Sequence, residues 1–199
     1  MLITNITSLT DLTVIGDGWI GYIENTWFDD ILKLPLLGRV ALQSDQYKVK
    51  ITRRFVITFP PRNKLSSLSI ICCNLVSFEF KGSHNLTSLN LQGNSVLTES
   101  GIPLLTTLNV MGTLIPMNSV RDKFPSVFKL SMSSLWWDGL GFEKLQRLRL
   151  DITISTWKSR FHLLLQFRSL CSFVLVNKLK EDVSSIFNPL KAKGVLCSD

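Results

Sequence analysis

A glycine pattern near the N-terminus is the part of the chain that most resembles a chemical motif. Gly16, Gly18 and Gly21 form a G-x-G-x-x-G turn directly after the strand-like run 12–15, and Asp45 follows Gly21 after 24 residues. In a dinucleotide-binding turn such glycines let the backbone approach a pyrophosphate, a helix N-terminus supplies N–H groups, and the acid binds a ribose hydroxyl. One interpretation is therefore a nucleotide-binding oxidoreductase fragment.

The context of this pattern favours a simpler interpretation. Trp19 places a bulky side chain where the pyrophosphate would pass, and no regular alternation of strands and helices follows. Glycines also serve to turn a chain out of a strand. We therefore expect Gly16 to Gly21 to lead the chain from a first strand into a helix over 23–32, where apolar residues have helical spacing, and we expect no cofactor.

Other catalytic constellations are absent from the sequence. His84 and His162 are the only histidines, and neither has a metal-ligand spacing relative to the four cysteines. There is no G-x-S-x-G nucleophile turn and no phosphate loop. Acidic pairs such as Asp29-Asp30 are typical of solvated helix surfaces. The sequence predicts neither an enzyme nor a metal site.

The strongest pattern is instead a repeated phrase, Leu-x-x-Leu-x-Leu-x-x-Asn, clearest over 86–94. Eight copies align on a central apolar residue, and the mean step between neighbouring copies is 23 residues. Units of this size cannot bury an apolar face alone, so a core forms only where neighbours stack. The central residues are Leu12, Val40, Leu68, Leu89, Leu108, Leu130, Leu148 and Phe173.

The phrase makes testable predictions about individual side chains. Leu89 and Leu108 hold the same place in consecutive copies, so we expect both to point inward from adjacent parallel strands. The ninth position favours Asn or Cys, whose side chain can satisfy backbone groups at the turn after the strand. Asn94 should therefore be buried there and bonded to backbone. Leu135 and Lys178 depart from this pattern.

These phrases resemble the leucine-rich-repeat family over about residues 9–178. The resemblance implies an α/β leucine-rich-repeat solenoid, with a curved parallel sheet on the concave side and short helices or irregular chain on the convex side. We expect one domain over 1–199, with about eight irregular repeats and a helical cap near 179–193. The N-terminal edge lacks a comparable cap, which suggests a fragment or one part of a larger assembly.

One segment does not follow the period. The strand-like run 75–80 lies too close to the phrases on either side to form a full repeat, and 55–59 is also strand-like. We interpret 75–80 as extended chain on the convex side of a short repeat. The alternative is a small antiparallel meander over 55–91, because strands about 11 residues apart suit hairpins.

The distribution of charge along the chain predicts which surface binds a partner. Residues 1–100 carry a net charge of +1, whereas residues 101–199 carry +6. Strand positions that alternate with the leucines should face away from the core, and in the later repeats they are basic. The predicted partner-binding residues are Lys129, Arg147, Arg149, Asn90 and Asn109.

These residues suit a protein partner with acidic or phosphorylated segments. A solvated basic face without a specific ligand is the competing interpretation. A second basic cluster that includes Lys48, Lys50 and Arg53 is interpreted as a charged edge that discourages strand pairing. Nucleic acid, a membrane or a small-molecule substrate is not the predicted partner.

Phrases such as Phe142-Glu-Lys-Leu145-Gln-Arg-Leu148 resemble the intracellular repeats of F-box/leucine-rich-repeat proteins. In that family the repeats present substrate to a ubiquitin ligase, and a separate F-box, not visible here, binds the adaptor. The sequence has no secretory leader, and its cysteines are expected to be buried reduced thiols in a cytoplasmic or nuclear protein. The sequons Asn5-Ile-Thr7 and Asn85-Leu-Thr87 leave a secreted or surface receptor-like module as an alternative.

Overall fold

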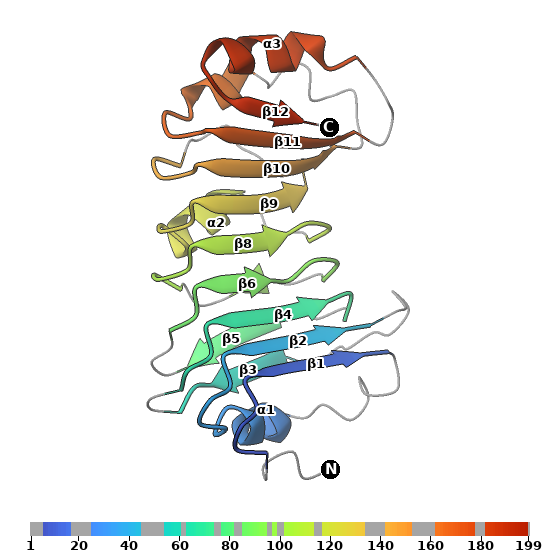
Figure 1. The fold of residues 1–199 in the computed structure, drawn as a ribbon, viewed down its shortest axis with the longest axis vertical. Helices are drawn as coiled ribbons and strands as arrows, with labels where there is room; N and C mark the ends of the chain where they lie inside the picture. The colour runs from blue at the N-terminus through green and yellow to red at the C-terminus, as the bar shows by residue number, and fades with distance from the viewer. Residues whose placement is uncertain are drawn as a thin grey trace.

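A computed structural model shows a mixed α/β protein with a large parallel sheet and few helices (Figure 1). The sheet is not closed into a barrel, because β1 and β12 lie at its two ends. The two chain termini also lie at opposite ends of the molecule in Figure 1. The structure describes residues 6–16, 25–44, 54–60, 63–73, 77–81, 85–94, 97–98, 102–113, 117–133, 142–152, 162–177 and 182–198.

The main sheet contains nine parallel strands that succeed one another in chain order. No reversal of direction occurs along this sheet, whereas a doubly wound nucleotide-binding sheet places its ligand at such a reversal. The strands are β1 (Asp11–Ile15), β2 (Arg39–Gln43), β4 (Ser67–Ile71), β6 (Ser88–Asn90), β8 (Thr107–Val110), β9 (Lys129–Ser133), β10 (Arg147–Ile152), β11 (Ser172–Asn177) and β12 (Leu196–Ser198).

The alignment of the eight phrases is confirmed residue by residue. Each central apolar residue is the register partner of the next one, from Leu12 opposite Val40 to Leu148 opposite Phe173. Leu89 and Leu108 are partners in adjacent parallel strands and are almost completely buried, as predicted. The apolar residues of the phrase therefore form continuous rows beneath the sheet.

A repeated hydrogen-bond pattern joins the starts of neighbouring strands. The carbonyl of Ser66 accepts from the N–H groups of both Thr87 and Ser88, at 2.9 and 3.0 Å, and the carbonyl of Thr87 accepts in the same way from Thr106 and Thr107. The Thr106 hydroxyl also donates to the Thr87 carbonyl at 3.0 Å. Each strand therefore starts level with its neighbour in the sheet, which keeps the rows of apolar side chains in register.

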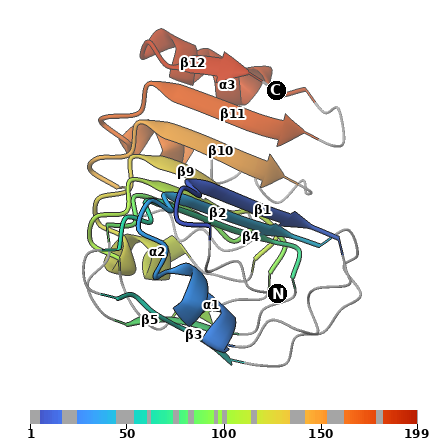
Figure 2. The same ribbon diagram turned by 60° about the horizontal axis from the view of Figure 1, so that its bottom comes forward.

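A second sheet lies across the core from the first and consists of β3 (Arg54–Thr58), β5 (Ser77–Lys81) and β7 (Leu97–Thr98). Figure 2 shows β3 and β5 on the same side of the main sheet as α1 (Asn25–Ile31) and α2 (Met117–Lys123). The pairs β3–β5 and β5–β7 are parallel, so the antiparallel meander considered for 55–91 is wrong.

The strands of the second sheet are parallel because, along the chain, a strand of the main sheet lies between each one and the next. β4 lies between β3 and β5, so the chain returns before it forms the next strand and enters it in the same direction. The expectation that 75–80 is extended chain opposite the main sheet agrees with β5. Its Phe80 stacks on Phe59, with ring centroids 5.7 Å apart, and both side chains are buried in the core.

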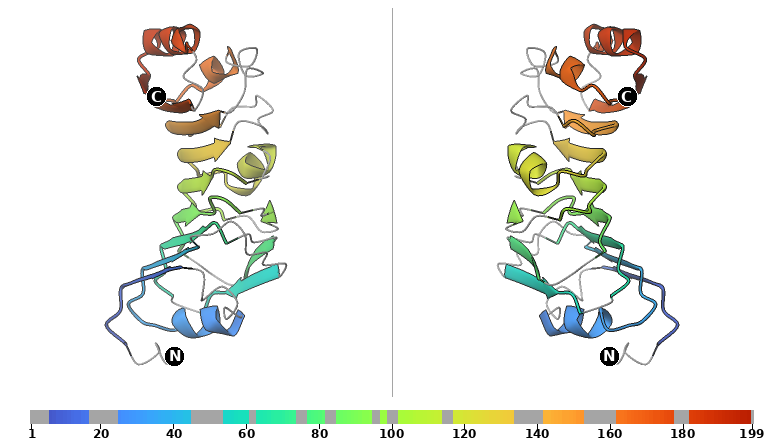
Figure 3. Two further views of the ribbon diagram at one scale, coloured as in Figure 1. Left: turned by 90° about the vertical axis from the view of Figure 1, so that its right-hand side faces the viewer. Right: turned by 90° about the vertical axis from the view of Figure 1, so that its left-hand side faces the viewer.

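Helices α1 and α2 cover part of the same side (Figure 3). The expected helix at 23–32 is α1, of which the structure describes 25–31. The step between Leu108 and Leu130 contains the seven-residue helix α2. Residues 162–166 form a 3-10 turn. None of the helices in the described residues is long and apolar enough to cross a membrane.

The C-terminal end contains a helix within the expected range 179–193 and, after it, a further strand. Helix α3 (Ser184–Ala192) packs Phe187 edge-on against Phe173, with centroids 6.1 Å apart. The chain then turns at Gly194, which has a φ of 82°, and adds β12 to the edge of the sheet. A ninth strand was not predicted, because 194–199 contains no leucine phrase; only Cys197 occupies the central position, opposite Phe173.

The turn after β6 is built as predicted around Asn94, whose residue is only 1% exposed. Its amide nitrogen donates to the carbonyls of Ile70 at 2.6 Å and Leu91 at 2.9 Å, and its oxygen accepts from the N–H of Cys73 at 3.1 Å. Asn94 therefore satisfies backbone groups of two successive turns. Asp17, Asp45, Leu135, Thr153 and Lys178, the ninth residues of five other copies, lie outside the described residues.

Candidate surface for partner binding

The outer face of the main sheet, defined here as the face opposite α1, α2 and β3, carries the predicted binding residues. Strand β10 shows how the sequence creates this face: Leu148 and Leu150 are buried, whereas Arg147 and Arg149 are exposed. Successive side chains of a strand alternate sides, so the leucines fix the direction of the arginines. The core of the protein thus positions its most basic outward residues.

A groove of about 370 Å³ runs over the outer face across β8, β9, β10 and β11. It brings together Lys129, Arg147, Arg149 and Asn109, four of the five predicted site residues. Small side chains lie between the long basic ones and leave the groove open. The remaining lining residues are Thr107, Leu108, Leu130, Ser131, Leu148, Ser172 and Val174.

The three cations of this groove lie close to one another. Lys129 is the register partner of Arg147 on the next strand, and adjacent strands are about 4.8 Å apart. Arg149 lies two residues further along β10, about 7 Å away on the same face. All three are exposed, and none forms a salt bridge with another described residue. Their charge is therefore available to a ligand.

The two asparagines contribute less than the sequence suggested. Asn109 lines the groove, but its side-chain oxygen accepts from the N–H of Met111 at 3.1 Å and its amide donates to Gln92 at 3.1 Å. Asn90 is its partner on β6, accepts from the N–H of Gln92 at 3.1 Å, and does not line the groove. Asn90 lies two strands from Lys129, outside the groove, and its role in partner binding stays a prediction.

The outer face is not uniformly positive. Asp151 lies two residues beyond Arg149 on the same side of β10, beside Ser133 of β9. Toward the N-terminal end, β4 presents Ser67 and Ser69 outward, and the outward cation Arg39 of β2 forms a salt bridge with Asp11 of β1 at 3.3 Å. Positive charge is thus concentrated over β9 and β10.

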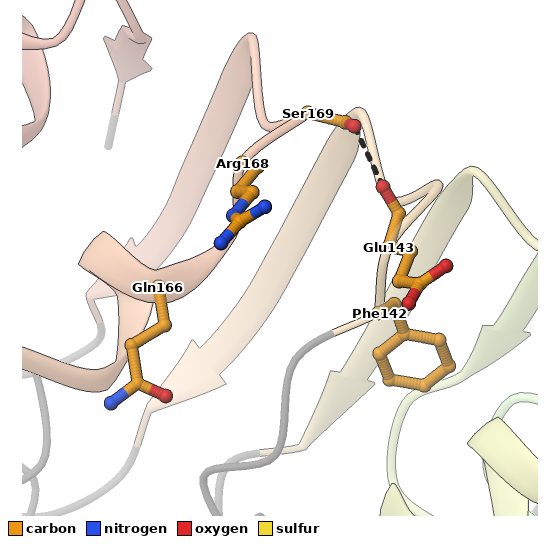
Figure 4. A pocket seen from close by; sticks show the side chains of 5 residues that line it. All are labelled: Phe142, Glu143, Gln166, Arg168 and Ser169. Carbon is orange, nitrogen blue, oxygen red and sulfur yellow. Dashed lines mark hydrogen bonds between the residues drawn. The ribbon is translucent and has the colours of Figure 1, made fainter.

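A second cavity, of about 530 Å³, lies near the starts of β10 and β11 and is lined by Phe142, Glu143, Gln166, Arg168 and Ser169. Figure 4 shows the Ser169 hydroxyl donating to the Glu143 main-chain carbonyl, at 2.6 Å. The four polar residues are exposed, and the cavity lining offers neither a nucleophile with an adjacent base nor a set of metal ligands. We therefore assign no chemistry to it.

The cysteines only partly match the expected buried thiols. Cys72 and Cys73 are buried, but Cys171 is exposed and Cys197 is half-buried, so the expectation is wrong for Cys171. Burial raises the pKa of the Cys197 thiol, although the Lys191 ammonium opposes that shift. A raised pKa keeps a thiol protonated and therefore poorly nucleophilic at neutral pH.

The structure describes only some residues of the other sequence motifs. The N–H of Gly16 donates to the Gln43 carbonyl at 3.0 Å and extends the β1–β2 ladder, so it does not face a pyrophosphate. Gly18 and Gly21 lie outside the described residues, as do Asn5, His84 and the basic residues 48–53. Among the residues that the structure does describe, no group of three or more His, Cys, Asp or Glu side chains could hold a metal ion.

No known protein family matches the chain, and no curated protein is significantly similar to it. The assignment of a function therefore depends on the site itself.

Apolar residues beside the groove were not predicted. Val174 of β11 lines the groove next to Arg149, its register partner. Leu196 of β12 lies one strand further and is 76% exposed. The alternation of β11 indicated the direction of Val174, but the position of Leu196 depends on a strand that lacks the leucine phrase.

Proposed function

We propose that this protein is a leucine-rich-repeat solenoid that acts as a non-catalytic protein-interaction module. The repeated phrase, the in-register strands that follow one another in chain order, and the recurring hydrogen bonds between strand starts support stacked repeat units. The outer face of the main sheet would then be the concave surface. Repeat proteins of this kind bind partners along an extended surface of stacked strands.

The proposed ligand is an acidic segment of a protein partner that binds over Lys129, Arg147 and Arg149. One observation carries this proposal: three cations from adjacent strands line a single open groove without a salt bridge to another described residue. Arginine pairs well with carboxylate and phosphate groups through two parallel N–H donors. Holding long side chains on a rigid sheet also lowers the entropic penalty of binding.

The resemblance to F-box/leucine-rich-repeat proteins suggests a more specific role. In that role the groove would recognise a substrate for a ubiquitin ligase in the cytoplasm or the nucleus. This step is supported by the resemblance of residues 142–150 to the repeats of that family. The last of these residues, 147–150, belong to β10, and the groove lies over this strand.

The test is a quantitative comparison of partner capture by tagged full chains. The Arg147→Glu/Arg149→Glu variant reverses both arginines of the groove. The control, Lys64→Glu/Lys144→Glu, changes the net charge equally at two exposed lysines that do not line it. We expect a set of proteins recovered with the wild type and the control to be lost with the arginine reversal.

Both variants should keep the melting temperature of the wild type within a few degrees, because exposed substitutions usually change stability by about 0.5 kcal/mol or less. Equal recovery by the two variants would contradict the proposed site. Loss of recovery with both variants would indicate attraction through net charge alone.

A further inference from the structure

We propose that the groove and Leu196 form one composite site for a peptide in the polyproline II conformation that carries a phosphorylated side chain and, about three residues away, an apolar side chain. This inference rests on the proposed function and names the chemistry of the partner segment. It combines two features of the outer face, which are the cationic cluster of β9 and β10 and the exposed leucine of β12, two strands from β10.

The cationic end of the site has more positive charge than one carboxylate requires. A single arginine can hold a carboxylate through a bidentate pair. Here Lys129, Arg147 and Arg149 occupy three corners of a patch with edges of about 5 to 7 Å. A phosphoryl group carries a charge of about −1.5 to −2 and three acceptor oxygens, so it can engage all three. The cluster therefore fits a phosphoserine or phosphothreonine better than a glutamate.

The apolar end follows from the strand register. Arg147 is the partner of Ser172 on β11, and Ser172 is the partner of Leu196 on β12. Register partners in parallel strands point to the same side of the sheet. Leu196 therefore belongs to the same outward row as Lys129 and Arg147. Its 76% exposure leaves an apolar surface at the end of that row, and Val174 lies between it and Arg149.

The spacing of the two ends sets the sequence pattern of the peptide. Leu196 is two strands from Arg147, which corresponds to about 9.6 Å at the usual strand separation. A chain in the polyproline II conformation advances about 3.1 Å per residue and has three residues per turn, so side chains three residues apart point to the same side and lie about 9.3 Å apart. The residue between the two ends in the row is Ser172, which is small enough for a peptide backbone to pass. A peptide lying across the strands would place both side chains at once.

Fluorescence polarisation with defined peptides tests this inference. The probe is a fluorescein-labelled peptide of alanine and glycine residues with one phosphothreonine and a leucine three residues later, and a second probe has the leucine three residues earlier. Matched peptides replace phosphothreonine by threonine or glutamate, or leucine by serine. At least one orientation of the phosphothreonine–leucine probe should bind about tenfold more tightly than each of its matched peptides.

Protein variants assign each end of the peptide to its residues. Leu196→Ser should weaken binding of the leucine probe by about tenfold and leave the affinity of the serine peptide unchanged. The effects of the protein substitution and of the leucine-to-serine change in the peptide should therefore be non-additive. The control Leu104→Ser alters another exposed leucine that does not line the groove and should have no effect. Arg147→Glu/Arg149→Glu should abolish binding of every phosphopeptide, whereas Lys64→Glu/Lys144→Glu should preserve it.

The remaining outcomes separate this inference from the proposed function. Equal binding of the glutamate and phosphothreonine peptides would overturn the preference for phosphate. Binding that is insensitive to leucine and to Leu196→Ser would overturn the composite site. If no phosphopeptide binds while partner capture still requires the two arginines, this inference fails and the proposed function stands. If partner capture does not require them, the proposed function itself fails.

Discussion

At the scale of single residues, the turns after the strands depend on backbone conformations that most side chains avoid. The eighth residue of the phrase has a positive φ in four copies: 114° at Gly16, 56° at Cys72, 70° at Gly93 and 68° at Gly112. Glycine adopts this conformation without steric penalty, whereas cysteine does not. Glycine recurs at this position in the sequence, at Gly16, Gly93 and Gly112.

Gly93 provides a sharp test of this packing. A Cβ atom at Gly93 would lie 2.8 Å from the sulfur of Cys72, whereas at Gly112 it would meet nothing closer than 3.5 Å. Both positions have positive φ, so both alanine variants should lose about 1 to 2 kcal/mol of unfolding free energy through the backbone alone. We expect Gly93→Ala to lose clearly more than Gly112→Ala in urea denaturation.

The additional loss should depend on the Cys72 sulfur. In the background Cys72→Ala, which removes that atom, the difference between Gly93→Ala and Gly112→Ala should shrink. An undiminished difference would show that the contact with Cys72 does not explain it.

Thiol reactivity checks the burial of the four cysteines. Cys171 is exposed and should react with a thiol reagent such as Ellman's reagent in the native protein at pH 8. Cys197 should react more slowly, because burial raises the pKa of its thiol and less of it is the reactive thiolate. Cys72 and Cys73 should react only after unfolding, and mass mapping of the labelled peptides identifies the order. Fast native labelling of Cys73 would contradict the packing of its turn.

At the scale of elements, the sequence predicted mainly the strands that contain the leucine phrase and their register. The central residues of all eight copies are in register, because alternation within each strand and the repeated step determine both direction and pairing. The segment 55–81 was ambiguous, because spacing along the chain cannot tell two hairpin strands from two strands separated by a third. The strand β12 was missed because its pairing comes from the packing of α3 and not from a periodic pattern.

The candidate site was predictable to a similar extent. Alternation in β9 and β10 correctly directed Lys129, Arg147 and Arg149 to one face, where they line one groove. Asn90 shares their face but not their groove, because the sequence does not show how far a groove extends across neighbouring strands. Leu196 could not be foreseen for the same reason that β12 could not.

The position of a strand within the sheet should determine how much its central leucine contributes to stability. Leu89 lies between two neighbouring strands and is fully buried, whereas Leu12, the same position of the phrase, lies on the edge strand β1 and is half-buried. Leu89→Ala should reduce the free energy of unfolding by about 2 to 5 kcal/mol, and Leu12→Ala by less than half of that. Urea denaturation of both variants measures this difference, and equal losses would contradict the stacking of the rows.

At the scale of the whole molecule, the two faces of the main sheet have different roles. One face forms the core and is covered by α1, α2 and the second sheet (Figure 3). The other face presents strand side chains to the outside. Because the leucines and the outward residues alternate, the outward positions can change without loss of the core. The proposed function therefore depends on a small part of a large regular surface, over β9 and β10.

The most direct test of that claim is site-specific photo-crosslinking from the outer face. A photo-reactive phenylalanine analogue replaces Ser131, which lies in the groove between Lys129 and Arg149, or Ser69, which occupies the same row on β4 outside the groove. Both serines are half-buried, so the two variants are closely matched. The account predicts that a partner that depends on Arg147 and Arg149 crosslinks at position 131 and not at 69. Crosslinking of that partner at 69 alone, or equally at both positions, would contradict it.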